Sequence, residues 1–110
     1  MFIQVRRITV KAGNADQVVA RFSKESPIDA MEGLIDKTVM TTKISREEEE
    51  VAVMIRWRSR DDWKNWEKSD AHLQGHREKK GQEPPEYVIS TKVNMYEVQS
   101  ITQGKASRSV

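Results

Sequence analysis

Hydrophobic and polar residues alternate along four stretches of the chain, with the period of two that is typical of β-strands. The first stretch is residues 2–10, and the second is residues 34–43, which follow Gly33. The third is residues 51–57, after a charged turn, and the fourth is residues 87–99. We expect these four segments to form strands.

A helical pattern separates the first two strands. Asn14 with Gln17 three residues later has the form of a capping box, which indicates a helix start. An apolar face follows at helical spacing, made of Ala15, Val18, Val19 and Phe22. Pro27 disfavours helix in the residue before it, so we expect this helix to end there at the latest.

A second helical pattern separates the last two strands. Ser59 with Asp62 three residues later predicts its N-cap. Ser69 and Asp70 interrupt the pattern, and the helix resumes until Gly81. The order is then strand, helix, strand, strand, broken helix, strand. This order predicts an α+β ferredoxin-like split βαβ fold, with an antiparallel four-stranded sheet and its helices on one face.

Both faces of the predicted sheet carry apolar residues, although its helices can cover only one. In the last strand one side presents Ile89, Val93 and Met95, and the other presents Val88, Tyr96 and Val98. Burying apolar surface stabilises a protein by about 25 cal/mol per Å². We therefore expect the uncovered face to pack against a second copy, so that two sheets form a homodimeric α+β barrel.

Length and composition narrow the class of protein. The 110 residues suit one domain, which we place at residues 1–101, with a flexible tail at residues 102–110. Cysteine is absent, which excludes disulfides and thiolate chemistry. We expect a soluble cytoplasmic protein that does not bind a membrane, since no apolar run approaches the roughly 20 residues of a membrane span. The net charge of +2 comes from scattered basic residues, which argues against nucleic-acid binding.

Candidate chemistry concentrates on the broken helix. The chain has two histidines, His72 and His76, and their i, i+4 spacing puts both on one helix face. Such a pair could chelate a divalent ion, one imidazole could ligate a haem iron, or both could be solvated side chains. Trp63 and Trp66 lie one turn apart and could belong to a core or to a pocket wall. Trp66 stands beside the helix break and is less readily placed in the core.

The segment from 51 to 76 resembles the small haem-degrading monooxygenases of the IsdG family, which have an antibiotic-biosynthesis-monooxygenase-like (ABM) domain. The resemblance rests on aromatic, hydroxyl, acidic and imidazole side chains at shared spacing: Trp57, Ser59, Trp66, Ser69, Asp70 and His76. Three further segments are similar in order and character, RRITVKAGNADQVVARF, MEGLIDKTVM and ISTKVNMYEV. The resemblance covers nearly the whole chain.

This resemblance implies a specific activity. It implies a dimer in which each subunit holds haem, as cofactor and as substrate, between its helices and its sheet. By position, His76 would be the iron ligand and Trp66 would press on the porphyrin and distort it. With O2 and an external electron donor or reductase, the ring would be opened and iron released. Imidazole suits iron, and distortion of the macrocycle is one means by which a protein controls haem.

Arg6 departs from the family pattern, because it stands where an asparagine is expected on the first strand. Alternation puts Arg6 on the same side as Ile8 and Val10, beneath the helices. We interpret it as a catalytic-site residue that donates hydrogen bonds to a haem propionate or to bound oxygen. Pairing with a carboxylate at the edge of the site is the alternative.

Two other functions remain open from the sequence. A cofactor-independent monooxygenase of the antibiotic-biosynthesis type would share the fold, and fold alone does not define chemistry. A haem-binding module without turnover is the second alternative.

Overall fold

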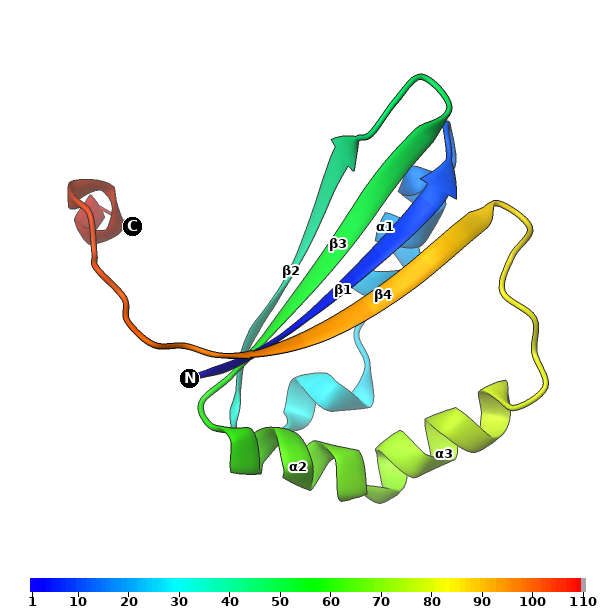
Figure 1. The fold of residues 1–110 in the computed structure, drawn as a ribbon. Coiled ribbons are helices and arrows are strands. Elements are labelled where there is room, and N and C mark those ends of the chain that lie inside the picture. The colour runs from blue at the N-terminus through cyan, green and yellow to red at the C-terminus, as the bar shows by residue number, and fades with distance from the viewer. Residues whose placement is uncertain (110) are drawn as a thin grey trace.

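The computed structural model describes residues 1–109, and within them the predicted fold is confirmed. The elements are β1 (Phe2–Lys11), α1 (Ala15–Ser23), the 3₁₀ helix η1 (Pro27–Ala30), β2 (Leu34–Lys43), β3 (Glu48–Trp57), α2 (Arg60–Lys68), α3 (Asp70–Lys79), β4 (Val88–Glu97) and the 3₁₀ helix η2 (Lys105–Ser109). The strands pair antiparallel in the order β2-β3-β1-β4. The central strand β1 is therefore flanked by β3 and β4, neither of which follows it directly in the chain. Figure 1 shows α1 behind the sheet and α2 followed by α3 along its lower end.

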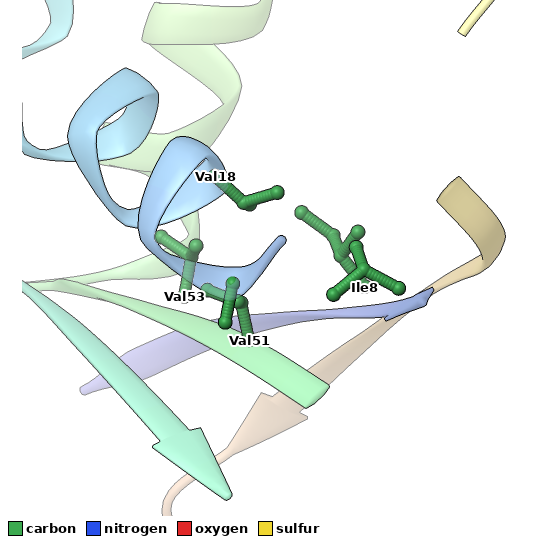
Figure 2. Close-up of a cluster of buried hydrophobic side chains, with 6 residues drawn as sticks. Ile8, Val18, Val51 and Val53 are labelled. Carbon is green, nitrogen blue, oxygen red and sulfur yellow. The ribbon is translucent and has the colours of Figure 1, made fainter. Parts of the chain in front are cut away.

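The main core lies between the sheet and α1. The side chains of Val10 and Val51 are fully buried, and Val53 is 2% exposed. They form one cluster with Ile8, Ala15 and Val18, so that three elements contribute to it (Figure 2). This confirms the predicted apolar face of residues 51–57 and the face of α1. Alternation in the strands and helical spacing in α1 direct both sets of branched side chains into the same layer.

The start of α1 differs from the predicted capping box. Asn14 is the N-cap residue, but its side chain makes no capping hydrogen bond. Its φ of −111° and ψ of 0° are helical rather than extended, so its side chain is turned away from the first helical N–H groups. Asn14 Oδ1 instead accepts a hydrogen bond from Gln17 Nε2 at 3.0 Å, and Asn14 Nδ2 donates to the Lys11 carbonyl oxygen at 3.0 Å.

The start of one strand and the presence of a short helix also differ from the sequence prediction. The sequence predicts a charged turn up to residue 50, yet β3 begins at Glu48, because the β1 ladder continues to the pair Lys11 and Glu48. The 3₁₀ helix η1 is not predicted by the sequence pattern. It begins at Pro27 and has a capping box, in which the Ser26 N–H donates to Asp29 Oδ2 at 2.9 Å. Lys37 Nζ on β2 lies 2.5 Å from Asp29 Oδ1 and ties η1 to the sheet.

A β-bulge changes the phase of β4. Its register with β1 shifts between Thr9 and Val10, so that Val10 pairs with Val88. Val88 therefore packs against the main core, and Ile89 is 47% exposed. The prediction that Val88 lies on the same side of the strand as Tyr96 was wrong, because a bulge residue reverses the alternation on one side of it.

The face of the sheet opposite the helices has no covering element within residues 1–109 (Figure 1). Partly buried and exposed apolar side chains lie on it, namely Ile3, Val5, Met40, Ala52, Met54 and Tyr96. The segment after β4 runs away from the sheet to η2, and no helix of the described chain is long and apolar enough to cross a membrane. The expected tail at residues 102–110 includes η2, and its last residue lies outside the described part. Its flexibility stays a prediction.

Candidate functional site

The start of α2 is fixed by a network around Asp62. Ser59 is the N-cap, as predicted, and its Oγ accepts from the Asp62 N–H at 3.2 Å. The Asp62 carboxylate accepts from Ser59 Oγ at 2.8 Å and from the Arg58 guanidinium at 2.9 and 3.0 Å. These hydrogen bonds, chiefly those from Arg58, lower the pKa of Asp62. A Cβ on Gly33 would clash with the Asp62 side chain, so the network requires glycine there.

The break between α2 and α3 is organised by a single hydroxyl group. Ser69 Oγ donates to the Trp66 carbonyl oxygen at 2.7 Å and accepts from the His72 N–H at 3.2 Å. Ser69 therefore ends one helix and begins the next, which confirms the predicted interruption. The same geometry brings the Trp66 and His72 rings together edge to face, with centroids 5.0 Å apart.

The three tryptophans have different surroundings. Trp57 is fully buried and forms a second core cluster with Phe2 and Ile28. Trp63 packs against this cluster, with its ring 5.2 Å from that of Phe2, so it belongs to the core. Trp66 is also half-buried against the cluster, but it meets His72 as well. Trp66 thus joins the second core cluster to the histidines.

The two histidines and Glu67 form a contiguous chain. His72 Nε2 lies 2.5 Å from Glu67 Oε2 and 3.1 Å from His76 Nε2. The imidazole rings are 4.5 Å apart between centroids. The His72 side chain is 19% exposed, whereas His76 is exposed at the surface of α3. Burial lowers the pKa of His72 below its ordinary value, outweighing the opposing effect of Glu67, and His76 lowers it further. The net effect favours the neutral form of His72.

Arg6 lies on the helix-facing side of β1, as predicted, and is half-buried. Burial and the nearby charge of Arg21 lower the pKa of Arg6, and Glu67 opposes them. Within residues 1–109, Arg6 makes no hydrogen bond or ion pair, so the carboxylate partner proposed as an alternative is not found. A half-buried cation without a partner is suited to receive an anionic ligand.

An exposed apolar surface adjoins Arg6 on β4. Val93 pairs with Arg6 and Met95 pairs with Gln4, so both side chains are on the helix-facing side of the sheet. They are nevertheless 41% and 39% exposed, and we call them the β4 wall. Leu73 on α3, one turn before His76, is also 41% exposed. Apolar side chains left uncovered near a set of polar groups are typical of a ligand site.

The three residues predicted for the site share one region. Trp66 and His76 both contact His72, and Glu67, which contacts His72, interacts electrostatically with Arg6. Sequence reasoning did not find the role of Glu67, because its contact with His72 crosses the helix break. Within residues 1–109 no group of three or more His, Asp or Glu side chains is arranged to hold a bare metal ion.

These features together suit haem. The His76 imidazole would ligate the iron, and the Trp66 indole and the β4 wall would contact the flat macrocycle. The Arg6 guanidinium would pair with the carboxylates of the macrocycle. The model of the antibiotic biosynthesis monooxygenase family matches residues 1–78, and the chain belongs to this family.

Particular relatives narrow the comparison. The chain is 56% identical over 104 residues to the haem-degrading monooxygenase HmoA of Bacillus subtilis, and the match covers 94% of this chain and 96% of that protein. A crystal structure of a candidate antibiotic biosynthesis monooxygenase from Bacillus cereus is 41% identical, covers 94% of this chain and 97% of its own, and superposes with a TM-score of 0.81. The haem-degrader MhuD of Mycobacterium tuberculosis, solved with two haems in its active site, is similar in fold alone, at 17% identity and a TM-score of 0.66 over 94% of this chain and all of that one.

Proposed function

We propose that this protein binds haem and degrades it as a monooxygenase, opening the porphyrin ring and releasing iron. The observation that carries the proposal is the combination of an accessible imidazole, an unpaired cation and an uncovered apolar wall on the helix-facing side. The extent of identity to HmoA supports the same activity. Haem, when bound, would supply both the iron that activates O2 and the carbon skeleton that is oxidised.

His76 would hold the iron. His76 is exposed, and a neutral imidazole nitrogen is a good iron ligand. The last turn of α3, which carries His76, also carries the cations Arg77 and Lys79. These charges favour an anionic ligand near this end of the helix.

Trp66 would set the shape of the bound macrocycle. Its indole packs against the second core cluster and also contacts the His72 ring. A side chain supported in this way resists displacement and can press on a ligand, which stores strain in a flat ring. The role of Trp66 is then to position the ring carbon that is oxidised.

Arg6 would supply positive charge from the sheet side. Its guanidinium has five donors and, as arginine does in proteins, keeps its positive charge. The group would bind a carboxylate of the ligand or stabilise negative charge that develops during oxidation. Arg6 is thus the third member of the proposed catalytic set, with Trp66 and His76.

The reaction needs partners that the chain does not contain. Ring opening by O2 consumes electrons, and the chain has no cysteine to provide them. We therefore assign O2 as co-substrate and an external reductase or small reductant as electron donor. A cytoplasmic site of action fits a protein that draws on such a donor.

A homodimer is the second part of this proposal. The uncovered face carries apolar residues on all four strands, and a two-fold partner would bury them. Sedimentation velocity at micromolar concentration should give about twice the chain mass of 12.7 kDa. Tyr96→Asp, at a site 44% exposed in the single chain, should shift the protein to monomer. Lys64→Asp, on the exposed surface of α2, should leave the dimer intact.

Haem titration followed by reduction in air tests the activity. The proposal predicts a Soret band on adding haem and decay of that band on adding ascorbate with O2. A Soret band that persists would favour the haem-binding module. The absence of any band would favour the cofactor-independent monooxygenase.

A further inference from the structure

Both imidazoles on α3 are candidates for the ligand of the haem iron. Both have nitrogens near the same point, since their Nε2 atoms are 3.1 Å apart. Two histidines one helical turn apart are chemically equivalent as iron ligands. Something in their surroundings must therefore decide which of them binds, and one difference between them is a carboxylate neighbour. Glu67 contacts His72 and not His76.

The Glu67 contact fixes the proton on His72. A carboxylate oxygen 2.5 Å from His72 Nε2 can only accept, so that nitrogen carries the hydrogen. His72 then has the Nε2–H tautomer, and its Nε2 has no lone pair for a metal. Burial between Trp66 and His76 holds the ring in this position.

The contact between the two imidazoles then determines the tautomer of His76. Two imidazole nitrogens 3.1 Å apart cannot both carry a hydrogen, because two N–H groups would repel each other. With the hydrogen on His72 Nε2, the lone pair is on His76 Nε2. That tautomer is the one required for iron ligation through Nε2.

Exchanging the two roles would be unfavourable. His72 could bind a metal through Nε2 only by leaving Glu67, whose side chain is 37% exposed. The carboxylate would then lose its donor in a partly desolvated place, where an unmade hydrogen bond is unfavourable. His76 gives up only its contact with His72.

From this geometry we propose that Glu67 selects the haem ligand, by holding the hydrogen on Nε2 of His72 and leaving the lone pair of His76 Nε2 to bind iron. Glu67 and His72 are then positioning residues, and neither touches the iron. The inference rests on the proposed haem binding, and it adds a reason why one histidine of the pair is the ligand.

Ferric haem titrations of paired variants test the selection, with the Soret band and electron paramagnetic resonance spectrum as readouts. His76→Ala should lose the histidine-ligated spectrum. Glu67→Ala with His76→Ala should regain it through the released His72 and bind haem about tenfold more tightly than His76→Ala alone. Glu67→Gln with His76→Ala is the matched control and should not recover, because the glutamine carbonyl oxygen still accepts from His72.

A triple variant that also removes the His72 side chain identifies the recovered ligand. Glu67→Ala with both His72→Ala and His76→Ala should lose the spectrum again, which would identify His72 as the recovered ligand. Recovery in the Glu67→Gln control equal to that in the Glu67→Ala variant would overturn the proposal. So would a folded Glu67→Ala, His76→Ala protein that binds haem no better than His76→Ala.

A measurement on the unsubstituted, haem-free protein gives an independent test. Long-range ¹H–¹⁵N correlation spectra distinguish protonated from unprotonated imidazole nitrogens. We expect a protonated Nε2 on His72 and an unprotonated Nε2 on His76, and the reverse would overturn the proposal. This result does not depend on haem binding, so a wild-type protein without a Soret band would contradict the proposed function while leaving the tautomer result to decide the inference.

Discussion

The helix-facing side of the sheet contains two regions that differ in how they are covered. On β1 and β3, Val10 and Val51 are fully buried beneath α1. On β4, Val93 and Met95 face the same way and are 41% and 39% exposed. Both regions are apolar, so composition does not explain the difference. The first region is a core completed by this chain, whereas the second is the surface that we propose haem covers.

The position of α2 and α3 explains why the β4 wall stays exposed. These two helices contact each other, and α3 contacts η1 rather than lying along β4. Trp57 and Trp63 hold α2 at the end of the sheet through the second core cluster. Ser69 then sets the direction of α3. The helices therefore leave the β4 wall exposed.

Placing the same carboxylate in both regions tests the difference in their burial most strongly. Val53→Asp buries an unpaired charge at a site 2% exposed, so we expect a loss of more than about 3 kcal/mol of unfolding free energy. Val93→Asp should change unfolding free energy by less than about 0.5 kcal/mol, since the site is exposed, but should weaken haem binding about tenfold. Urea unfolding and haem titration measure the two effects. Equal destabilisation would show that β4 is part of the core.

The next largest effect concerns the two histidines. His76→Ala removes the iron ligand and should weaken haem binding by about 100-fold, with loss of turnover. His72→Ala should keep a histidine-ligated Soret band, because His76 remains. Spectroscopic titration compares them. Greater loss in His72→Ala would show that ligation had been assigned to the wrong imidazole.

The tryptophans separate packing from ligand contact. Trp57→Leu leaves a void in a fully buried site and should lower the unfolding free energy by roughly 2–4 kcal/mol. Trp66→Leu should cost about 1 kcal/mol, since its ring is half-buried, but should slow haem decay about tenfold while binding persists. Thermal unfolding and the rate of Soret decay are the measurements. If Trp66→Leu proves the less stable of the two, Trp66 is a core residue.

The smallest expected change is at Arg6. Arg6→Ala removes a half-buried, unpaired cation and should slow Soret decay about three- to tenfold, with the Soret band retained. Arg6→Asn keeps hydrogen-bond donors and should recover part of the rate. Decay at the wild-type rate in Arg6→Ala would exclude a contribution from this side chain to the reaction.

Alternation and helical spacing predicted the fold because the central strands β1 and β3 are well covered on one side. Val51 and Val53 are examples, since both are buried in the core, as their spacing of two residues predicts. The same reasoning failed at Val88, where a bulge changes the phase, and at η1, which is too short for a periodic pattern. Turn chemistry at Ser26 could have indicated η1, since serine followed by aspartate three residues later is a capping pattern.

The candidate site was only partly predictable. Trp66 and His76 came from the resemblance to a family, and the spacing of the histidines left several roles open. The contact of Glu67 with His72 depends on the angle between α2 and α3, which Ser69 sets through two hydrogen bonds. No period in the sequence reports such an angle. The exposure of the β4 wall likewise depends on where the helices pack.

The most direct test of the account is a single-turnover assay with one equivalent of haem, ascorbate and O2, in the presence of catalase to remove free peroxide. A ferrous chelator reports released iron while the Soret band is followed. The account predicts that the band decays and that iron release reaches about one equivalent, with neither change in His76→Ala. A stable Soret band in the wild-type protein, or decay that is the same in His76→Ala, would contradict it.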